Sequence, residues 1–144
     1  MALRPGDPRY PAALLELAPP PPVLHVMGRL EHPPERAVAI VGARAASPYG
    51  RGMARRLAED LAMLGHAVIS GLARGIDAAA HEGALAPGGA TVAILPSSLS
   101  QITPAGHAPL ARRIAATGAL ASEVAEGGPF GRGAFVKRNR IIAA

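Results

Sequence analysis

The sequence predicts an α/β fold: a Rossmann-like parallel sheet with helices on both faces. Short apolar runs recur along the chain, and their starts lie about 24 to 30 residues apart, the length of a strand–helix–strand unit. The segments between the runs have the spacing of amphipathic helices. Aromatic residues make up only 3% of the chain, so the core must consist of Ala, Val, Ile and Leu, which suits close packing of helices on a sheet.

Four apolar runs are typical of buried parallel strands. They are Ala37–Val41, Ala67–Ser70, Thr91–Leu95 and Ala119–Ser122. A fifth run, Val23–Gly28, predicts a short strand at the edge of the sheet. We therefore divide the chain into an N-terminal arm with this edge strand, residues 1–36, and a Rossmann-like domain, residues 37–144.

Three helices are predicted between the parallel strands. The first begins at Ser47-Pro48, a cap followed by proline at the first helical position, and ends at Gly65. The others should span about Ile76 to Leu85 and about Gly106 to Thr117. In the first helix the apolar residues at helical spacing, which should face the core, are Met53, Leu57, Leu61 and Leu64.

Composition excludes several classes of protein. The chain has no cysteine and its five histidines show no His-x-x-x-His spacing, so we expect no metal site. No apolar run approaches the roughly 20 residues that span a bilayer, and the N-terminus lacks a signal-peptide core, so we expect a cytoplasmic protein without a membrane association. The formal charge is +5, mostly from arginine, which favours an anionic partner.

Two glycine-containing loops follow the first two parallel strands. The first, Gly42–Gly50, carries Arg44, and the second, which begins at Ser70-Gly71, carries Arg74. Because carboxyl ends of parallel strands meet at one edge of the sheet, these loops favour a shared anion groove. Ordinary turns with arginines in solvent remain the alternative. Neither loop has the pattern of a dinucleotide or Walker site, so no cofactor is expected.

Several charged or polar side chains near these loops have simpler interpretations. Asp77 lies in a first helical turn, where a cap or dipole partner is more common than a general base, and His81 one turn later is expected to be structural. Arg51 lies one turn into an exposed helix, so we expect Arg44 to contribute more to binding than Arg51.

The motifs together resemble those of the DNA-processing protein A family (DprA, also called Smf). Gly42-Ala43-Arg44 with Pro48-Tyr49-Gly50 is similar to the family's Gly-Ser-Arg and Pro-Tyr-Gly elements. Ser70 to His81 resembles Ser-Gly-x-Ala-x-Gly-x-Asp-x-x-x-His, and Phe135 to Ile142 resembles Phe-Pro-x-Arg-Asn-Arg-Ile-Ile. The order of the three motifs is far more specific than any one of them.

The resemblance implies a binding protein, not an enzyme, which holds single-stranded DNA in a basic pocket and loads RecA onto it during natural transformation. A homodimer is a further expectation, although the family's surfaces for dimerisation and RecA contact lie largely beyond the matched region. The polar residues Lys137 to Arg140 follow the aromatic Phe135 closely. Grooves that bind single-stranded DNA combine cations with aromatic rings in this way, which supports the same function on physical grounds. The expected DNA-binding residues are Gly42, Arg44, Ser70, Gly71, Arg74, Phe135, Lys137, Arg138, Asn139 and Arg140.

The sequence departs from the family in two places. The loop Pro96–Thr103 lacks the family's glycines, which puts its share in binding in doubt, although Ser97 and Ser98 offer hydroxyls to a phosphate. The sequence also ends at Ala144, so the domain is expected to be truncated at the C-terminus relative to the family. A fragment, a shortened gene product and an oligomer that covers the gap are all consistent with this.

Two alternative functions also place a ligand at the carboxyl ends of the parallel strands. One is a nucleotide phosphoribohydrolase resembling the LOG proteins, whose Pro-Gly-Gly-x-Gly-Thr-x-x-Glu element is matched only by Pro87-Gly88-Gly89-Ala90-Thr91, without the glutamate. The other is a nucleotide sensor that does not bind DNA. Nucleoside release and DNA titration distinguish the three functions.

Overall fold

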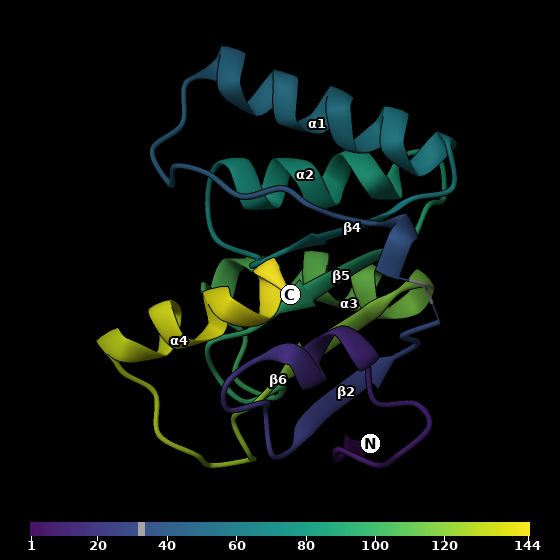
Figure 1. Ribbon diagram of the computed structural model, residues 1–144. Coiled ribbons are helices and arrows are strands. Elements are labelled where there is room, and N and C mark those ends of the chain that lie inside the picture. Colours follow the sequence, from purple (N-terminus) through teal and green to yellow (C-terminus); the bar gives the residue numbers. More distant parts are fainter. Residues whose placement is uncertain (32–33) are drawn as a thin grey trace.

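A six-stranded sheet forms the centre of the molecule in the computed structural model, which describes residues 1–31 and 34–144 (Figure 1). The strand order is β1-β2-β6-β5-β4-β3. The strands are β1 (Ala2–Leu3), β2 (Leu24–Gly28), β3 (Ala37–Ala39), β4 (Ala67–Ser70), β5 (Thr91–Ile94) and β6 (Ala119–Ser122). Residues 32–33, within the predicted arm, lie outside the described part of the chain.

The four predicted parallel strands are confirmed. β3, β4, β5 and β6 pair in parallel in the order of the sequence, with Val68 opposite Val38 and Ala93 opposite Leu120. Along β5, alternate residues belong to opposite faces: Val92 and Ile94 pack in one apolar cluster and Ala93 in another. Both faces of the sheet are therefore buried, as continuous apolar runs predict.

The strand predicted at the edge is not the outermost strand. β2 runs antiparallel to β6 and is itself covered by β1, which is also antiparallel. The Met1 ammonium donates to the Val26 carbonyl at 3.1 Å, and the Val26 N–H donates to the Met1 carbonyl at 2.8 Å. The sheet is thus mixed, and the N-terminal residues close its β2 side.

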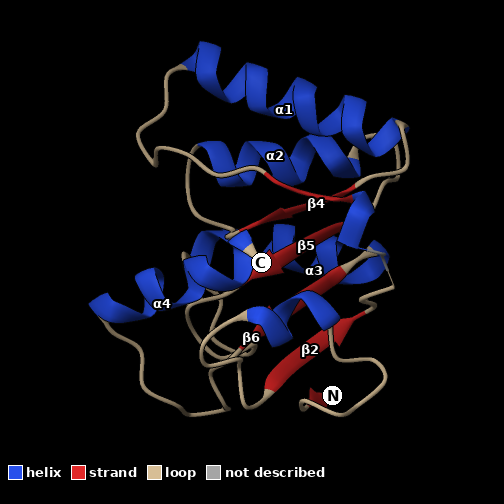
Figure 2. Ribbon diagram, viewed as in Figure 1, coloured by secondary structure: helices blue, strands red, loops and turns tan. Residues whose placement is uncertain are grey.

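Helices cover both faces of the sheet (Figure 2). Successive parallel strands follow one another across the sheet, so right-handed crossovers place α1 (Pro48–Met63), α2 (Ile76–Leu85) and α3 (Ala108–Thr117) on one face. The other face is covered by α4 (Arg132–Ala143) and by the arm with its 3₁₀ helix η1 (Ala12–Glu16). Two further 3₁₀ turns are η2 (Pro34–Arg36) and η3 (Ala105–His107).

The face of α1 that packs inward differs from the predicted one. Ala54 and Ala58 are buried, whereas Met53, Leu57 and Leu64 are 50%, 52% and 72% exposed. The cause is a close approach to α2: a Cβ added at Gly83 would lie 2.0 Å from the Arg55 carbonyl oxygen. Helices this close accommodate only small side chains between them, so Met53 and Leu57 lie outside, and of the four predicted residues only Leu61 packs against this core.

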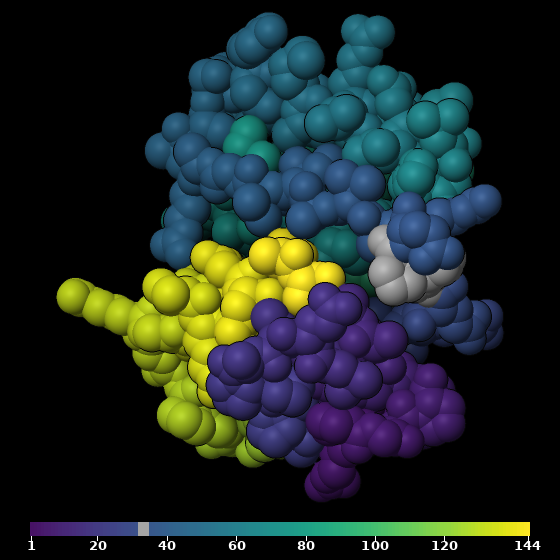
Figure 3. Space-filling view, viewed as in Figure 1, coloured from purple at the N-terminus to yellow at the C-terminus, as the bar shows by residue number. Residues whose placement is uncertain are grey.

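The N-terminal arm is packed into the core beside α4. The Tyr10 hydroxyl donates to the Pro21 carbonyl at 2.8 Å, and Leu3 and Leu14 pack with Ile141. In the space-filling view, α4 lies directly against the arm (Figure 3). Within the described residues, no helix is both long enough and apolar enough to cross a membrane.

Candidate nucleic-acid interface

The first two βα loops lie in contact at the carboxyl edge of the parallel strands. The Ile76 N–H donates to the Ala43 carbonyl at 3.2 Å. Gly75, with φ of 79°, lies so close that an added Cβ would be 2.3 Å from the Ala43 oxygen and 2.5 Å from the Arg44 oxygen. Only glycine allows this backbone contact, which joins the two predicted loops into one surface.

Arg44 and Phe135 form the centre of this surface. The Arg44 guanidinium carbon lies 4.6 Å from the centroid of the Phe135 ring, in the range of a cation–π contact. Phe130 meets the same ring edge-on, with centroids 5.6 Å apart. Arg44 itself is exposed, so its N–H groups are open to solvent beside the Phe135 ring.

Two more cations are exposed at this edge of the sheet. Arg74 lies in the loop after β4, and Lys137 lies on the second turn of α4. Neither takes part in an ion pair with another residue in 1–31 or 34–144. The predicted cations Arg44, Arg74 and Lys137 are therefore free to meet an anionic ligand.

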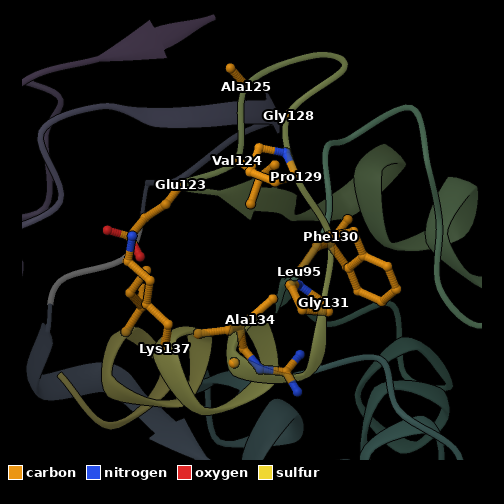
Figure 4. Close-up of a pocket in the computed structure, with 14 residues that line it drawn as sticks. Leu95, Glu123, Val124, Ala125, Gly128, Pro129, Phe130, Gly131, Ala134 and Lys137 are labelled. Carbon is orange, nitrogen blue, oxygen red and sulfur yellow. The ribbon is translucent and has the colours of Figure 1, made fainter.

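A pocket of about 510 Å³ opens between α4 and the segment after β6. Leu95 and Pro96 belong to its apolar lining, together with Phe130, which also contacts Phe135. In Figure 4, Lys137 and Glu123 lie at one end and Phe130 at the other. The pocket thus combines an apolar wall with a cation at its rim.

Arg138, one of the predicted DNA contacts, is directed into the protein. Its side chain is buried, and one terminal nitrogen donates to both the Gly71 and Ile94 carbonyls at 2.7 Å. Burial lowers the pKa of Arg138, and the nearby Asp77 carboxylate opposes that effect. The guanidinium therefore cross-links α4 to the ends of β4 and β5.

The next two motif residues are also engaged within the chain. The Asn139 side-chain oxygen accepts from Nε of Arg138 at 3.0 Å. Arg140 forms an ion pair with Glu123 and donates to the Pro19 carbonyl at 2.9 Å. Arg140 thus ties α4 to the arm and to the end of β6.

The small residues predicted at the site have packing partners inside the protein. A Cβ on Gly42 would lie 2.6 Å from the Ile76 side chain, and a Cβ on Gly71 would lie 2.6 Å from the Arg138 guanidinium. The Ser70 hydroxyl is buried and donates to the Ile40 carbonyl at 2.6 Å. These residues position the loops from within.

Asp77 and His81 have the structural contacts that were expected. An Asp77 carboxylate oxygen accepts from the Gly71 N–H at 3.1 Å, and His81 is fully buried between Leu72 and Thr91. Burial, with smaller electrostatic contributions from His107 and Arg138, lowers the pKa of His81 to about 3. His81 is therefore neutral near pH 7.

The serines of the third loop differ from the expectation, and two other features concern the alternative function and the role of Arg51. Ser97 and Ser98 are buried, and the Ser97 hydroxyl donates to the Gln101 carbonyl, so these hydroxyls do not face a ligand. The Pro87–Gly89 turn precedes β5 and lies at the opposite, amino edge of the strands. Arg51 donates to the Ala46 carbonyl and so holds the loop that carries Arg44.

Sequence reasoning missed Phe130. It follows Gly127-Gly128-Pro129, an irregular segment without a motif, but it is 40% exposed and contacts Phe135. A signal did exist, because the chain has only two phenylalanines and they lie close together in sequence beside the third motif.

Comparison with known proteins identifies relatives along the whole chain. Residues 1–144 match the model of the family described as DNA recombination-mediator protein A. Protein Smf from Synechocystis sp. is 42% identical over 145 residues, which cover 98% of this chain and 36% of that protein.

Two solved structures share the fold. DprA from Streptococcus pneumoniae matches with a TM-score of 0.85 and 30% identity, covering 99% of this chain and 50% of that one. DprA from Helicobacter pylori, from a study of its single-stranded DNA binding mode, matches with a TM-score of 0.84 and 31% identity, covering 99% and 63%. The chain thus spans between about a third and two thirds of the length of these relatives. It belongs to the DNA recombination-mediator protein A family.

Proposed function

We propose that the chain binds single-stranded DNA at the surface formed by Arg44, Phe135 and the exposed cations beside them. The observation that carries the proposal is the exposed Arg44 guanidinium held over the Phe135 ring. Single-strand sites combine cations for the phosphates with aromatic faces on which bases stack. Arg74 and Lys137 supply further charge at the same edge, and Phe130 adds a second ring.

The proposal assigns a binding role and no catalytic role to this edge. Asp77 is held by Gly71 and His81 is buried and neutral, so neither is poised as a general acid or base for a ligand at Arg44. The Pro87–Gly89 turn, the weak match to the phosphoribohydrolases, lies at the other edge. Release of a nucleobase from a nucleoside monophosphate would contradict this assignment.

The test is a titration of labelled oligonucleotides, single-stranded and duplex, at matched salt. We expect tighter binding of the single strand, because paired bases cannot stack on the exposed Phe130 ring or on the Arg44 guanidinium. The affinity should fall with salt, with a logarithmic slope of about 0.7 for each phosphate contacted. Equal or stronger duplex binding, or an affinity that does not change with salt, would contradict the proposal.

We further propose that the bound strand is passed to RecA. The family's description as a recombination mediator supports this step, and so does the similarity to DprA proteins. RecA filament growth on single-stranded DNA coated with a single-strand binding protein measures it. Faster filament growth in the presence of the chain is the expected result, and unchanged growth would confine the role of this segment to DNA capture.

A further inference from the structure

The backbone of Leu72, in the loop between β4 and α2, is held on both sides by histidines. Its N–H donates to Nε2 of His81 at 3.2 Å. Its carbonyl lies 2.8 Å from Nδ1 of His107, which must carry the proton because a carbonyl can only accept. Side chains from α2 and from η3 therefore satisfy both polar groups of one loop residue.

Leu72 needs such support. Its φ of 61° lies in the left-handed region, and it is the only non-glycine residue there in the described part of the chain. That conformation is strained for an L-residue, because it brings Cβ close to the following carbonyl oxygen. The Leu72 side chain is fully buried in the cluster that contains Leu95 and Ile114, so it cannot relax without leaving the core.

The tautomer of His81 follows from its neighbours. The Thr91 hydroxyl donates to the Val68 carbonyl at 2.6 Å, so its oxygen is left to accept from Nδ1–H of His81 at 2.7 Å. The ring is neutral, since burial lowers the pKa of His81 to about 3. Nε2 is then an unprotonated acceptor aimed at the Leu72 N–H.

His107 connects the third βα loop to this residue. That loop is folded on itself: Ser122 donates to the Ser97 carbonyl at 2.7 Å, and Ser97 donates to Gln101. Its buried serines do not reach the ligand edge. The loop packs its apolar side chains in the same cluster as Leu72, and the His107 imidazole adds a hydrogen bond to the second loop.

We propose that His81 and His107 form a clamp on Leu72 that positions the arginines of the DNA site, with His107 as the contribution of the third loop. Arg74 follows Leu72 by two residues, and Gly75 packs on the carbonyl of Arg44. A shift at Leu72 therefore displaces both cations relative to Phe135. The clamp rests on the proposed function, because it acts by preorganising the surface assigned to single-stranded DNA.

His107 provides the sharpest test, because it is only partly buried and its variants differ in where they place a donor. In His107→Asn the side-chain amide nitrogen replaces Nδ1, whereas His107→Gln moves the amide one bond further and His107→Ala removes it. We expect His107→Ala to weaken oligonucleotide binding about threefold to tenfold, the value of one neutral hydrogen bond. His107→Asn should restore most of the affinity and His107→Gln should not.

His66→Ala serves as the matched control. His66 lies before β4, at the amino edge of the strands, and its buried Nδ1 has no hydrogen-bond partner in the described residues. The affinity of the His66→Ala variant for the oligonucleotide should equal that of the wild type. Thermal unfolding of each variant confirms that affinities are compared between folded proteins, and the Asn and Gln pair decides the question if His107→Ala does not fold.

Amide hydrogen exchange and ¹⁵N imidazole shifts test the clamp without DNA. We expect faster exchange at Leu72 in His107→Ala and a His81 ring protonated at Nδ1 in the wild type. If the wild type does not bind DNA, the proposed function fails while these spectra still decide whether the clamp exists. Unchanged affinity of folded His107→Ala, or equal losses in the Asn and Gln variants, would overturn the proposal.

Discussion

Arginines at the carboxyl edge of this sheet occupy two opposite environments. Arg44 and Arg74 are exposed on the loops, whereas Arg138 is buried and Arg140 is paired with Glu123, although both belong to a motif that resembles a DNA-contacting element. The exposed set offers its N–H groups to a ligand. Arg138 and Arg140 use the same groups to satisfy carbonyls of the strand ends and the arm. A basic motif therefore combines ligand contacts with cross-links of the fold, and the two respond differently to mutation.

The largest effect should come from acid acting on the buried network. His81 has a pKa of about 3 in the folded chain, against 6.5 when unperturbed. The contribution of this pKa difference to the free energy of unfolding is therefore fully present above pH 6.5, where the ring is neutral in both states. That contribution is lost as the pH falls from 6.5 through 3 and amounts to about 5 kcal/mol. Protonation turns Nε2 into a donor facing the Leu72 N–H.

Urea unfolding between pH 7 and pH 4 measures about 3 kcal/mol of this contribution, because the pH then falls about 2.5 units below the unperturbed pKa of 6.5. His81→Gln keeps an acceptor for Leu72 but does not titrate, so its free energy of unfolding should change less with pH than that of the wild type. Parallel pH profiles for the two proteins would show that His81 is not the group responsible.

The second effect separates the buried arginine from the exposed ones. Arg138→Ala leaves the Gly71 and Ile94 carbonyls without their donor and the Asp77 carboxylate without its cation. We expect a loss of about 3 kcal/mol in the free energy of unfolding. Arg74→Ala, the matched exposed change, should cost less than about 0.5 kcal/mol. If Arg138→Ala keeps its stability and loses DNA affinity instead, Arg138 is a ligand contact.

The smallest effect concerns DNA affinity alone. Arg44→Ala should weaken single-strand binding by on the order of 1.5 to 3 kcal/mol, because directed charged hydrogen bonds are lost. Arg51 is not a neutral control, since it holds the Ala46 carbonyl. Arg56, exposed about two turns into α1, replaces it and should lose only screened attraction. Indistinguishable affinities of Arg44→Ala and Arg56→Ala would favour a nonspecific electrostatic model.

Strand positions were predictable because burial on both faces leaves continuous apolar runs, as in Thr91–Ile94. The two-residue strand Ala2–Leu3 has no such signal, so β2 was wrongly placed at the edge. Apolar spacing also misplaced the buried face of α1. It marks an amphipathic helix, but the close approach at Gly83 selects alanines for the interface.

The candidate site was predictable in location but not in the direction of its side chains. Arg44 and Arg74 were predicted to lie on one surface because each follows a parallel strand in a glycine-containing loop, and the carboxyl ends of parallel strands share an edge of the sheet. Residue type alone cannot distinguish the exposed Lys137 from its buried neighbour Arg138, because that depends on carbonyls supplied by Gly71 and Ile94. The contact between His107 and Leu72 spans 35 residues and has no local pattern.

The outward face of α1 has a practical use for spectroscopy. Met63 is 69% exposed at the end of a 16-residue helix whose first turn adjoins the loop of Arg44, so it lies roughly 22 Å along the axis from that loop. The chain contains no cysteine, and Met63→Cys would therefore provide a unique thiol for a fluorophore. Energy transfer from that dye to an end-labelled oligonucleotide would report the polarity with which the strand crosses the surface.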